Sequence, residues 1–165
     1  AALATPVFLS LYAENDLRLD KYFAETDEKG FRKNKKAGSN NYLCTFRVGE
    51  IYLTAAEAAA RLGELSQART RLLELMRKRY APEAYEAKSV VVNAMDKEAL
   101  VQEILDERAR ELAFEGHRWF DLRRSTRPRL EKVLDGTRYV LEENDARYTL
   151  AIPKEAIEAN PGLLN

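Results

Sequence analysis

The sequence contains one cysteine, Cys44, in 165 residues. A single thiol cannot form an internal disulfide and cannot supply the ligands of a cysteine-rich metal site, so both are excluded. Free cysteines most often behave as small buried apolar side chains, and we expect that role for Cys44. The thiol does not indicate a compartment, because one cysteine is compatible with the cytosol and with export.

The chain also lacks an excess of either charge and lacks any long apolar run. Its 27 basic and 27 acidic residues give a formal net charge of +0. A nucleic-acid-binding protein carries a basic excess or stripe, so we expect no nucleic-acid partner. No run approaches the roughly 20 apolar residues that span a bilayer. The first residues, 1–6, have no basic flank and are not an intact signal peptide.

His117 is the sole histidine, which restricts metal sites. Glu103, Glu107, Glu111 and Glu115 are spaced by four residues and should form one acidic stripe along a helix. Di-iron sites in helical bundles need a Glu-x-x-His motif on each of two helices. Here the histidine follows Glu115 by two positions and therefore points to another face. We predict no metal site and no cofactor.

The sequence also shows no recognisable arrangement of catalytic side chains. With one histidine no Ser-His-Asp triad can be argued, and no glycine-rich phosphate loop is present. Carboxylates are abundant, but candidates have a basic partner at helical reach: Arg108 precedes Glu111 by three residues, and Arg118 precedes Asp121 by three. Such partners lower carboxylate pKa values, which is the wrong direction for the general acid of a glycosidase. We predict no catalytic residue and no enzymatic activity.

Hydrophobic residues make up 45% of the chain and recur mostly at helical spacing. A first helix is predicted from about 46 to 62, ended by Gly63. Ser66 can cap a second helix from 67 to about 79. The short turn predicts antiparallel neighbours, and so a helical hairpin. The predicted apolar face of the first helix consists of Ile51, Ala55, Ala58, Ala59 and Leu62.

The segments around this hairpin are less regular. Residues 1–45 are predicted to be an irregular lead-in with one short helix at 17–24. The basic run at 32–36 is typical of a solvated loop. Residues 80–95 are predicted to be a connection, with a short strand at 90–92 as one option.

The carboxyl-terminal half is predicted to add helices and one hairpin. Helices are expected at 97–115, capped by Asp96, and at 117–124. Two short strands, 139–141 and 148–150, should form a small β-hairpin. A last short helix is expected to begin at Ile152-Pro153 and to end at Asn160.

The stretch 106–124 combines carboxylates, guanidiniums, the sole histidine and the sole tryptophan, as an active site would. We favour a structural interpretation, in which the charges pair along and between two helices. Trp119 and Phe120 should then fill the core where the helices join. Two functional interpretations stay open: His117 as a pH-sensitive group, and Trp119 as a platform for a sugar ring.

Two resemblances follow from these motifs. The pattern Tyr52…Ala56…Ala59…Gly63-Glu-Leu65…Ala68…Leu72 resembles one tetratricopeptide repeat unit, without a second copy near a spacing of 34 residues. Because of this resemblance, a tetratricopeptide-like protein–protein interaction adaptor is an alternative function. The order of four motifs along the chain resembles that of the SusD/RagB family. These motifs are Arg47-x-x-Glu-Ile-Tyr-Leu-x-x-Ala-Glu-Ala-x-Ala-x-Leu-Gly63, Arg77-x-Arg79, Glu107-Arg-x-x-Glu-Leu-x-Phe-Glu-Gly-x-Arg-Trp-Phe-Asp-Leu-x-Arg124 and Ile152-Pro-x-x-x-Ile157-x-x-Asn160-Pro-x-Leu163-x-Asn165.

The SusD/RagB resemblance implies both a fold and a function. The implied fold is mainly α, with tetratricopeptide-like helical hairpins, long irregular loops and one small β-hairpin near the carboxyl terminus. The implied function is non-catalytic binding of a nutrient, chiefly a glycan, and its delivery to a SusC-like TonB-dependent transporter. The family consists of outer-membrane, cell-surface lipoproteins, and this chain resembles their carboxyl-terminal part. We expect one domain over 1–165, attached to the membrane only through a lipid anchor outside it.

Ligand-binding residues stay unknown at this stage. Ligand contacts in the SusD/RagB family come largely from variable loops, so no motif position of this sequence transfers as a ligand residue.

Overall fold

Helices account for most of the structure, and the predicted mainly α fold class is confirmed. The protein is represented by a computed structural model that describes residues 3–36, 47–134, 136–160 and 162. Backbone packing divides the chain into two compact units, 1–118 and 119–165. No helix in these described stretches is both long and apolar enough to cross a membrane. Cys44, predicted to be buried, lies outside the described residues.

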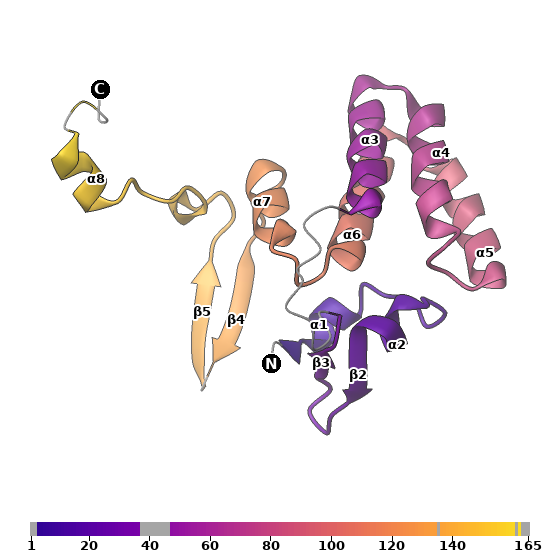
Figure 1. The fold of residues 1–165 in the computed structure, drawn as a ribbon, viewed down its shortest axis with the longest axis horizontal. Coiled ribbons are helices and arrows are strands. Elements are labelled where there is room, and N and C mark those ends of the chain that lie inside the picture. The colour runs from indigo at the N-terminus through magenta and orange to yellow at the C-terminus, as the bar shows by residue number, and fades with distance from the viewer. Residues whose placement is uncertain (1–2, 37–46, 135, 161, 163–165) are drawn as a thin grey trace. The chain divides into compact units, whose positions relative to one another are not determined.

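The predicted helical hairpin is formed by α3 (Val48–Leu62) and α4 (Leu65–Met76), which lie side by side (Figure 1). Gly63 ends α3 with a φ of 87°, and its N–H bonds two carbonyls in the preceding turn. Glycine adopts this left-handed conformation without the penalty of a Cβ, so the turn is as tight as predicted. α4 begins earlier than expected: Glu64 stands at its cap position, and the prediction that Ser66 caps it is wrong.

Residues predicted to be a connection form a further helix, α5 (Pro82–Ala94). The strand option at 90–92 rested on three consecutive valines, whose β-branched side chains favour strands. Pro82 occupies the first turn of α5, where its missing N–H costs nothing. Val92 is fully buried against neighbouring helices, so tertiary packing overrides the local preference for a strand.

Two helices complete the predicted set. α6 (Lys97–Glu111) is capped as expected by Asp96, whose carboxylate accepts a hydrogen bond from a first-turn N–H at 2.9 Å. It ends four residues before its predicted end, because Phe114 has a φ of 62°, which is incompatible with a right-handed helix. Gly116 follows with a φ of 85°, and α7 (His117–Arg124) begins directly after it, as predicted.

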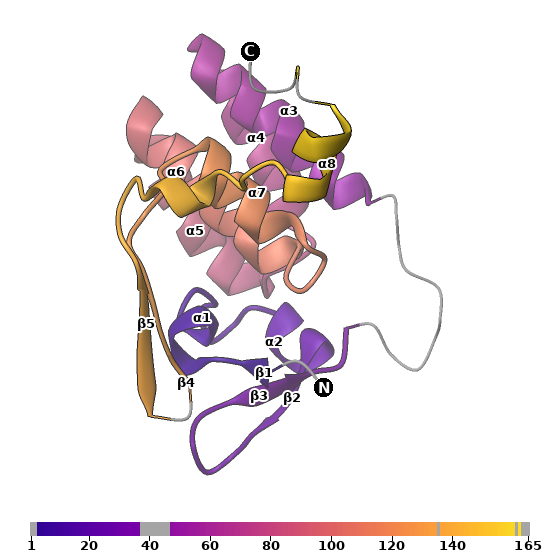
Figure 2. The same ribbon diagram turned by 90° about the vertical axis from the view of Figure 1, so that its left-hand side faces the viewer.

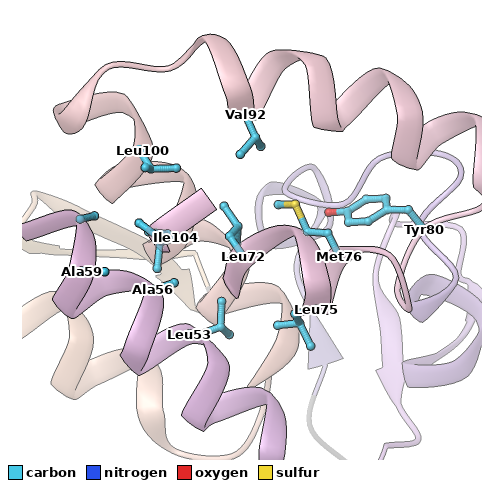
Figure 3. Close-up of a cluster of buried hydrophobic side chains, with 12 residues drawn as sticks. Leu53, Ala56, Ala59, Leu72, Leu75, Met76, Tyr80, Val92, Leu100 and Ile104 are labelled. Atoms are coloured by element: carbon cyan, nitrogen blue, oxygen red, sulfur yellow. The ribbon is translucent and has the colours of Figure 1, made fainter. Parts of the chain in front are cut away.

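The core of the first unit lies between α3, α4, α5 and α6 (Figure 3). α3 turns Leu53 and Ala56 into this core, whereas Ile51 and Ala55 of the predicted apolar face are exposed. The prediction of that face is therefore wrong for all its members except Ala59. The two sides of α3 are both apolar, so helical spacing alone cannot tell which side packs. The buried members of the core are Leu53, Ala56, Ala59, Ala60, Ala68, Leu72, Leu75, Met76, Tyr80, Val92, Leu100 and Ile104.

The segment before α3 is folded, which corrects the prediction of an irregular lead-in. β1 (Leu3–Ala4), β2 (Phe23–Thr26) and β3 (Arg32–Asn34) form an antiparallel sheet in the order β1-β3-β2. Two short helices, α1 (Pro6–Leu9) and α2 (Arg18–Tyr22), accompany this sheet (Figure 2). The strands have two to four residues, which is too short for an alternating pattern to be recognised in the sequence.

The basic run at 32–36 is part of this fold and not a solvated loop. Its first three residues form β3, and the side chain of Lys36 reaches the end of α6. A small apolar cluster lies beside the sheet, where the rings of Tyr12 and Phe23 meet edge to face with centroids 5.5 Å apart.

In the second unit, β4 (Leu130–Leu134) and β5 (Thr137–Leu141) pair antiparallel. The prediction of a small β-hairpin near the carboxyl end is thus confirmed, but its position is partly wrong. Residues 139–141 do lie in a strand, whereas Tyr148 ends a short 3-10 helix, η1 (Ala146–Tyr148). The Asp-Gly sequence at 135–136 is the stronger hairpin signal, and it explains why the partner strand precedes β5.

The final element of the second unit is α8 (Lys154–Ala159). Pro153, predicted to be its first helical residue, stands at its cap position, so α8 begins one residue later than predicted. Asn160 is the residue at which α8 ends, as predicted.

Candidate functional site

Two glutamates of the predicted acidic stripe are buried on α6 among charged side chains of the first unit. Glu107 and Glu111 lie one turn apart, and both side chains are 0% exposed. Carboxylates are almost never fully buried unless they are paired, so their partners define the region. We call it the α6 charge cluster, with the members Asp16, Arg18, Arg47, Arg79, Tyr80, Glu107, Arg110 and Glu111.

Glu107 is held from two directions. It accepts a hydrogen bond from Nη1 of Arg18 at 2.7 Å and another from Nε of Arg110 at 2.8 Å. The Tyr80 hydroxyl donates to its second oxygen at 3.2 Å. Burial alone would raise the pKa of Glu107, but the charges of Arg18 and Arg110 outweigh that effect and lower it. Glu107 and Arg110 thus form an ion pair three residues apart along α6.

Glu111 is paired with three arginines that come from outside α6. Arg79 donates through Nε at 2.7 Å and Nη2 at 2.9 Å, and Arg47 donates through Nη2 at 2.6 Å. Arg18 adds a longer bond of 3.2 Å. Burial of the Glu111 carboxyl would raise its pKa, but the hydrogen bonds from Arg79 and the surrounding positive charge lower it to about 2.

Arg18 connects the amino-terminal segment to α6. Its guanidinium is 2% exposed and binds Asp16 through two parallel hydrogen bonds of 2.9 and 2.8 Å. This fork-to-fork geometry is the strongest form of a carboxylate–arginine pair. The rings of Tyr12 and Tyr80 lie within cation–π distance, at 5.8 and 5.3 Å from the guanidinium carbon.

Lys36 forms a second connection, at the carboxyl end of α6. Its ammonium donates to the carbonyl oxygens of Glu111 at 2.5 Å and Ala113 at 3.3 Å, and it pairs with the Glu115 carboxylate. Cations are favoured at this end of a helix because the carbonyl dipoles point toward it. Burial lowers the pKa of Lys36, although its bond with Glu115 opposes that effect.

The α6 charge cluster is built to hold segments together. Arginines lower the pKa values of Glu107 and Glu111, so these two carboxyl groups are poorly suited to donate a proton in general acid catalysis. Across the stretches of chain that the structure describes, no three histidine, cysteine or acidic side chains group as metal ligands. The cluster neutralises buried charge and joins Asp16 and Arg18, near the amino end, to α6.

Gly49 allows the amino end of α3 to approach this cluster. A Cβ added at Gly49 would lie 2.8 Å from Oε1 of Glu111, closer than real Cβ contacts allow. We therefore expect Gly49→Ala to lower the free energy of unfolding by about 1–3 kcal/mol, as overpacking of a buried site does. Thermal unfolding of the variant measures this effect. Gln67→Ala, at an exposed position of α4, is the matched control, and equal midpoints for the two variants would contradict the steric argument.

The aromatic residues of 106–124 behave differently from each other. Trp119 stacks on Tyr148 with ring planes 12° apart and centroids at 5.2 Å, and Tyr148 is fully buried. Trp119 is itself only partly buried, so it packs on a buried ring but does not fill the core as predicted. Phe120 is 62% exposed, so the prediction that it fills the core is wrong. Adjacent residues of a helix point to different sides, so a helix at the surface that packs through Trp119 leaves Phe120 exposed.

Two polar residues of α7, His117 and Asp121, contact other charged side chains. Asp121 is buried and accepts hydrogen bonds from Nε and Nη2 of Arg124 at 3.0 and 2.6 Å. The Arg118–Asp121 pair stays a prediction. His117 lies with Nδ1 at 3.6 Å from the Glu50 carboxylate, and both side chains are about one-third exposed. This contact ties the start of α7 to α3 and is strongest when the histidine is protonated.

One hollow lies beside the β2–β3 hairpin. Its volume is about 430 Å³, and it is lined by Ala24, Glu25, Asp27, Phe31 and Lys33. An aromatic ring next to charged side chains is compatible with a polar ligand, but the hollow shares no residue with the α6 charge cluster. Sequence reasoning gave no signal for it, because it depends on a hairpin that the sequence does not reveal.

Comparison with known proteins agrees with this fold. A SusD-like protein of Formosa agariphila is 31% identical over 115 residues, a match that covers 69% of this chain and 22% of that protein. The solved structure of a SusD-like carbohydrate binding protein from Bacteroides vulgatus superposes with a TM-score of 0.63 at 19% identity, covering 95% of this chain and 40% of the other. This chain thus spans less than half the length of either relative. The model of the SusD family matches residues 8–165, and the chain therefore belongs to the SusD family.

Proposed function

We propose that this chain is the carboxyl-terminal scaffold part of a protein that binds glycans and delivers them to a SusC-like TonB-dependent transporter. The observation that carries this proposal is the SusD family match over residues 8–165. The Bacteroides vulgatus protein of similar fold is described as carbohydrate binding, which supports a glycan as the ligand class.

The role proposed for this part is support of a binding site, without catalysis. The α6 charge cluster joins residues far apart in the sequence, such as Arg18 and Glu111, and so fixes the amino-terminal segment on the helices. A rigid support of this kind holds loops in place for ligand contact. The low pKa of Glu111, about 2, argues against its use as an acid in sugar hydrolysis.

We further propose that the protein acts at the cell surface, held on the outer membrane by a lipid outside this chain. Protease treatment of intact cells tests this location. Degradation of the protein by an external protease, with a periplasmic marker left intact, is the expected result. Survival of the protein until the cells are lysed would contradict the surface location.

Glycan binding is tested on the protein as its gene encodes it, by native electrophoresis in gels that contain single polysaccharides. We expect slower migration in at least one polysaccharide gel, because a bound immobile polymer retards the protein. A non-binding protein of similar mass, run in every gel, corrects for sieving. Unchanged migration in all gels, together with no calorimetric heat from soluble oligosaccharides, would contradict the proposal.

A tetratricopeptide-like adaptor is the second candidate function, and exposed apolar residues on α3 favour it. Val48 and Leu62 are 64% and 76% exposed, on a helix of the predicted repeat-like hairpin. Genomic position separates the two candidates: a neighbouring gene for a TonB-dependent transporter supports glycan delivery. Capture of a defined protein partner without any glycan binding would favour the adaptor.

A further inference from the structure

The hairpin of β2 and β3 (Figure 2) contains a β-bulge. Its pairing register shifts within β2, so Ala24 and Glu25 together lie opposite the single residue Lys33 of β3. A bulge removes residues from the regular ladder and re-aims their side chains, and for this reason bulges are frequent next to active sites. All the residues at this bulge line the hollow beside the hairpin. We call it the bulge hollow, with the lining residues Ala24, Glu25, Asp27, Phe31 and Lys33.

Neighbouring groups hold the bulge and the hairpin turn in place. The guanidinium of Arg32 donates from Nε to the carbonyl oxygen of Ala24 at 2.5 Å, which satisfies a backbone acceptor at the bulge. In the turn, Oδ1 of Asp27 accepts hydrogen bonds from the backbone N–H groups of Lys29 at 3.0 Å and Phe31 at 2.8 Å. The bulge hollow is therefore preformed, which lowers the entropic cost of binding a ligand there.

The bulge hollow combines one aromatic ring with three charged side chains. Glu25, Asp27 and Lys33 are exposed, and Phe31 is partly buried. Within the described stretches of the chain, Glu25 and Lys33 form no ion pair, and only Oδ1 of Asp27 is used by the turn. The charges of the α6 charge cluster, in contrast, bind one another. The polar groups of the hollow are thus available to a ligand.

A saccharide is the class of ligand that this lining fits. One face of a sugar ring consists of C–H groups and packs on an aromatic plane, while hydroxyl groups surround its edge. Carboxylates accept hydrogen bonds from hydroxyl groups, and an ammonium donates to them. The volume of about 430 Å³ lies within the range of roughly 300–1,000 Å³ that is usual for small-molecule sites.

The charge of the bulge hollow narrows this class further. Two carboxylates, of Glu25 and Asp27, outnumber the one ammonium, of Lys33. A uronic acid or a sulfated sugar would bring a further negative charge next to these carboxylates, which is unfavourable. The hollow is therefore suited to uncharged sugars.

We propose that the bulge hollow binds one sugar ring of a neutral saccharide. The ring stacks on Phe31, and its hydroxyl groups donate to Glu25 and to Oδ2 of Asp27. Lys33 donates to a further oxygen of the sugar. The first unit thus contacts the ligand itself, in addition to supporting loops. This inference rests on the proposed glycan-binding function and adds to it a location and a preference for uncharged sugars.

Acetylation of Lys33 tests the proposal on the protein as its gene encodes it. N-hydroxysuccinimidyl acetate modifies exposed lysines, and mass spectrometry gives the rate at each one. Lys154, whose side chain is 85% exposed, is the internal control. The probes are maltotriose, cellotriose, xylotriose and mannotriose, with trigalacturonate as the acidic probe. We expect at least one neutral probe to slow acetylation of Lys33 at least about threefold, because a bound sugar covers most of the site. The rate at Lys154 should not change.

Variants then show whether the protection arises in the bulge hollow. In Phe31→Ala, the saccharide concentration that half-protects Lys33 should rise at least about tenfold, because the stacking surface is lost. Phe31→Tyr should restore the parent value. Asp27→Asn keeps Oδ1 for the turn but replaces Oδ2 by a donor, so we expect a rise of about threefold or more. Phe120→Ala, an exposed aromatic position outside the hollow, is the matched control and should behave as the parent.

Three outcomes would overturn the inference. The first is that no neutral probe slows acetylation of Lys33; the polysaccharide gels then decide separately whether the proposed glycan-binding function stands. The second is protection with the same half-protecting concentration in the parent and in Phe31→Ala, since the sugar would then bind elsewhere. The third is protection by trigalacturonate alone, which would assign the hollow to acidic saccharides. If Phe31→Ala does not fold, Asp27→Asn serves the same comparison.

Discussion

Replacing Glu111 with alanine is expected to lower the free energy of unfolding by about 3–5 kcal/mol, the range for removing one partner of a buried ion pair. The change deletes a carboxylate that is 0% exposed. It also removes the acceptor shared by Arg18, Arg47 and Arg79, whose charges then repel one another inside the protein. Urea unfolding followed by circular dichroism measures the loss.

Glu74→Ala is the matched control for this prediction. Glu74 also pairs with an arginine, Arg71, at 3.2 Å, but its side chain is 45% exposed. An exposed pair of this kind contributes about 0.5 kcal/mol. If Glu111→Ala were no more destabilising than Glu74→Ala, the α6 charge cluster would not be what holds the first unit together.

The pH dependence of protein stability is an independent test of the role of Glu111. The pKa of Glu111 falls from an ordinary value of 4.5 to about 2 in the folded protein. A carboxyl group whose pKa is lowered by folding stabilises the protein above its unfolded pKa, and this contribution disappears as it becomes protonated. The stability difference between the wild type and Glu111→Gln should therefore be full at neutral pH and shrink between about pH 4.5 and 2. A difference that is constant over this range would contradict the assigned pKa.

The parts of the fold that the sequence predicted are those determined by neighbouring residues. Gly63 ends α3 in a left-handed conformation, and Asp96 caps α6 through its own side chain. Both signals act within one helical turn, so they can be read without knowing what packs nearby. The spacing of the acidic stripe is equally local: Glu103, Glu107 and Glu111 lie on α6 as predicted, whereas Glu115 lies beyond the end of this helix.

The parts that were missed depend on distant residues. The partners of Glu111 lie 93, 64 and 32 residues away in the sequence. No local pattern indicates that these charges meet, and a stripe of four glutamates is ordinarily solvated. The helix at Pro82–Ala94 was missed for the same reason, because burial of Val92 in the core of the first unit decides its structure.

The SusD/RagB motifs gain a physical meaning from this arrangement. Arg47, Arg79, Glu107 and Glu111 are all motif residues, and they meet in the α6 charge cluster. Their spacing in the sequence follows from the lengths of the helices that carry them. The motif therefore records a structural connection, which is why it identified the family without locating a ligand.

Replacing Arg18 with methionine is expected to cost about 3–5 kcal/mol as well, because the acidic groups that it neutralises stay buried. Asp16, Glu107 and Glu111 all lose a hydrogen-bonded cation. Arg18 joins α2 to α6, so the destabilisation should be greatest in the amino-terminal segment. Hydrogen exchange measures this: amides of β2 and β3 should exchange faster, and amides of α4 should change less.

A double-mutant cycle separates the Arg18–Glu107 interaction from general damage to the core. Glu107→Gln alone leaves the Arg18 charge with two other carboxylates, whereas Arg18→Met alone leaves a buried negative charge. Each single change loses the Arg18–Glu107 attraction, whereas the double change loses it only once. The double variant should therefore be more stable than the sum of the single losses predicts, by about 1–3 kcal/mol. Arg71→Met with Glu74→Gln, the exposed pair on α4, should be additive within about 0.5 kcal/mol. Additivity in both cycles would mean that Arg18 stabilises the protein through packing of its side chain and not through its charge.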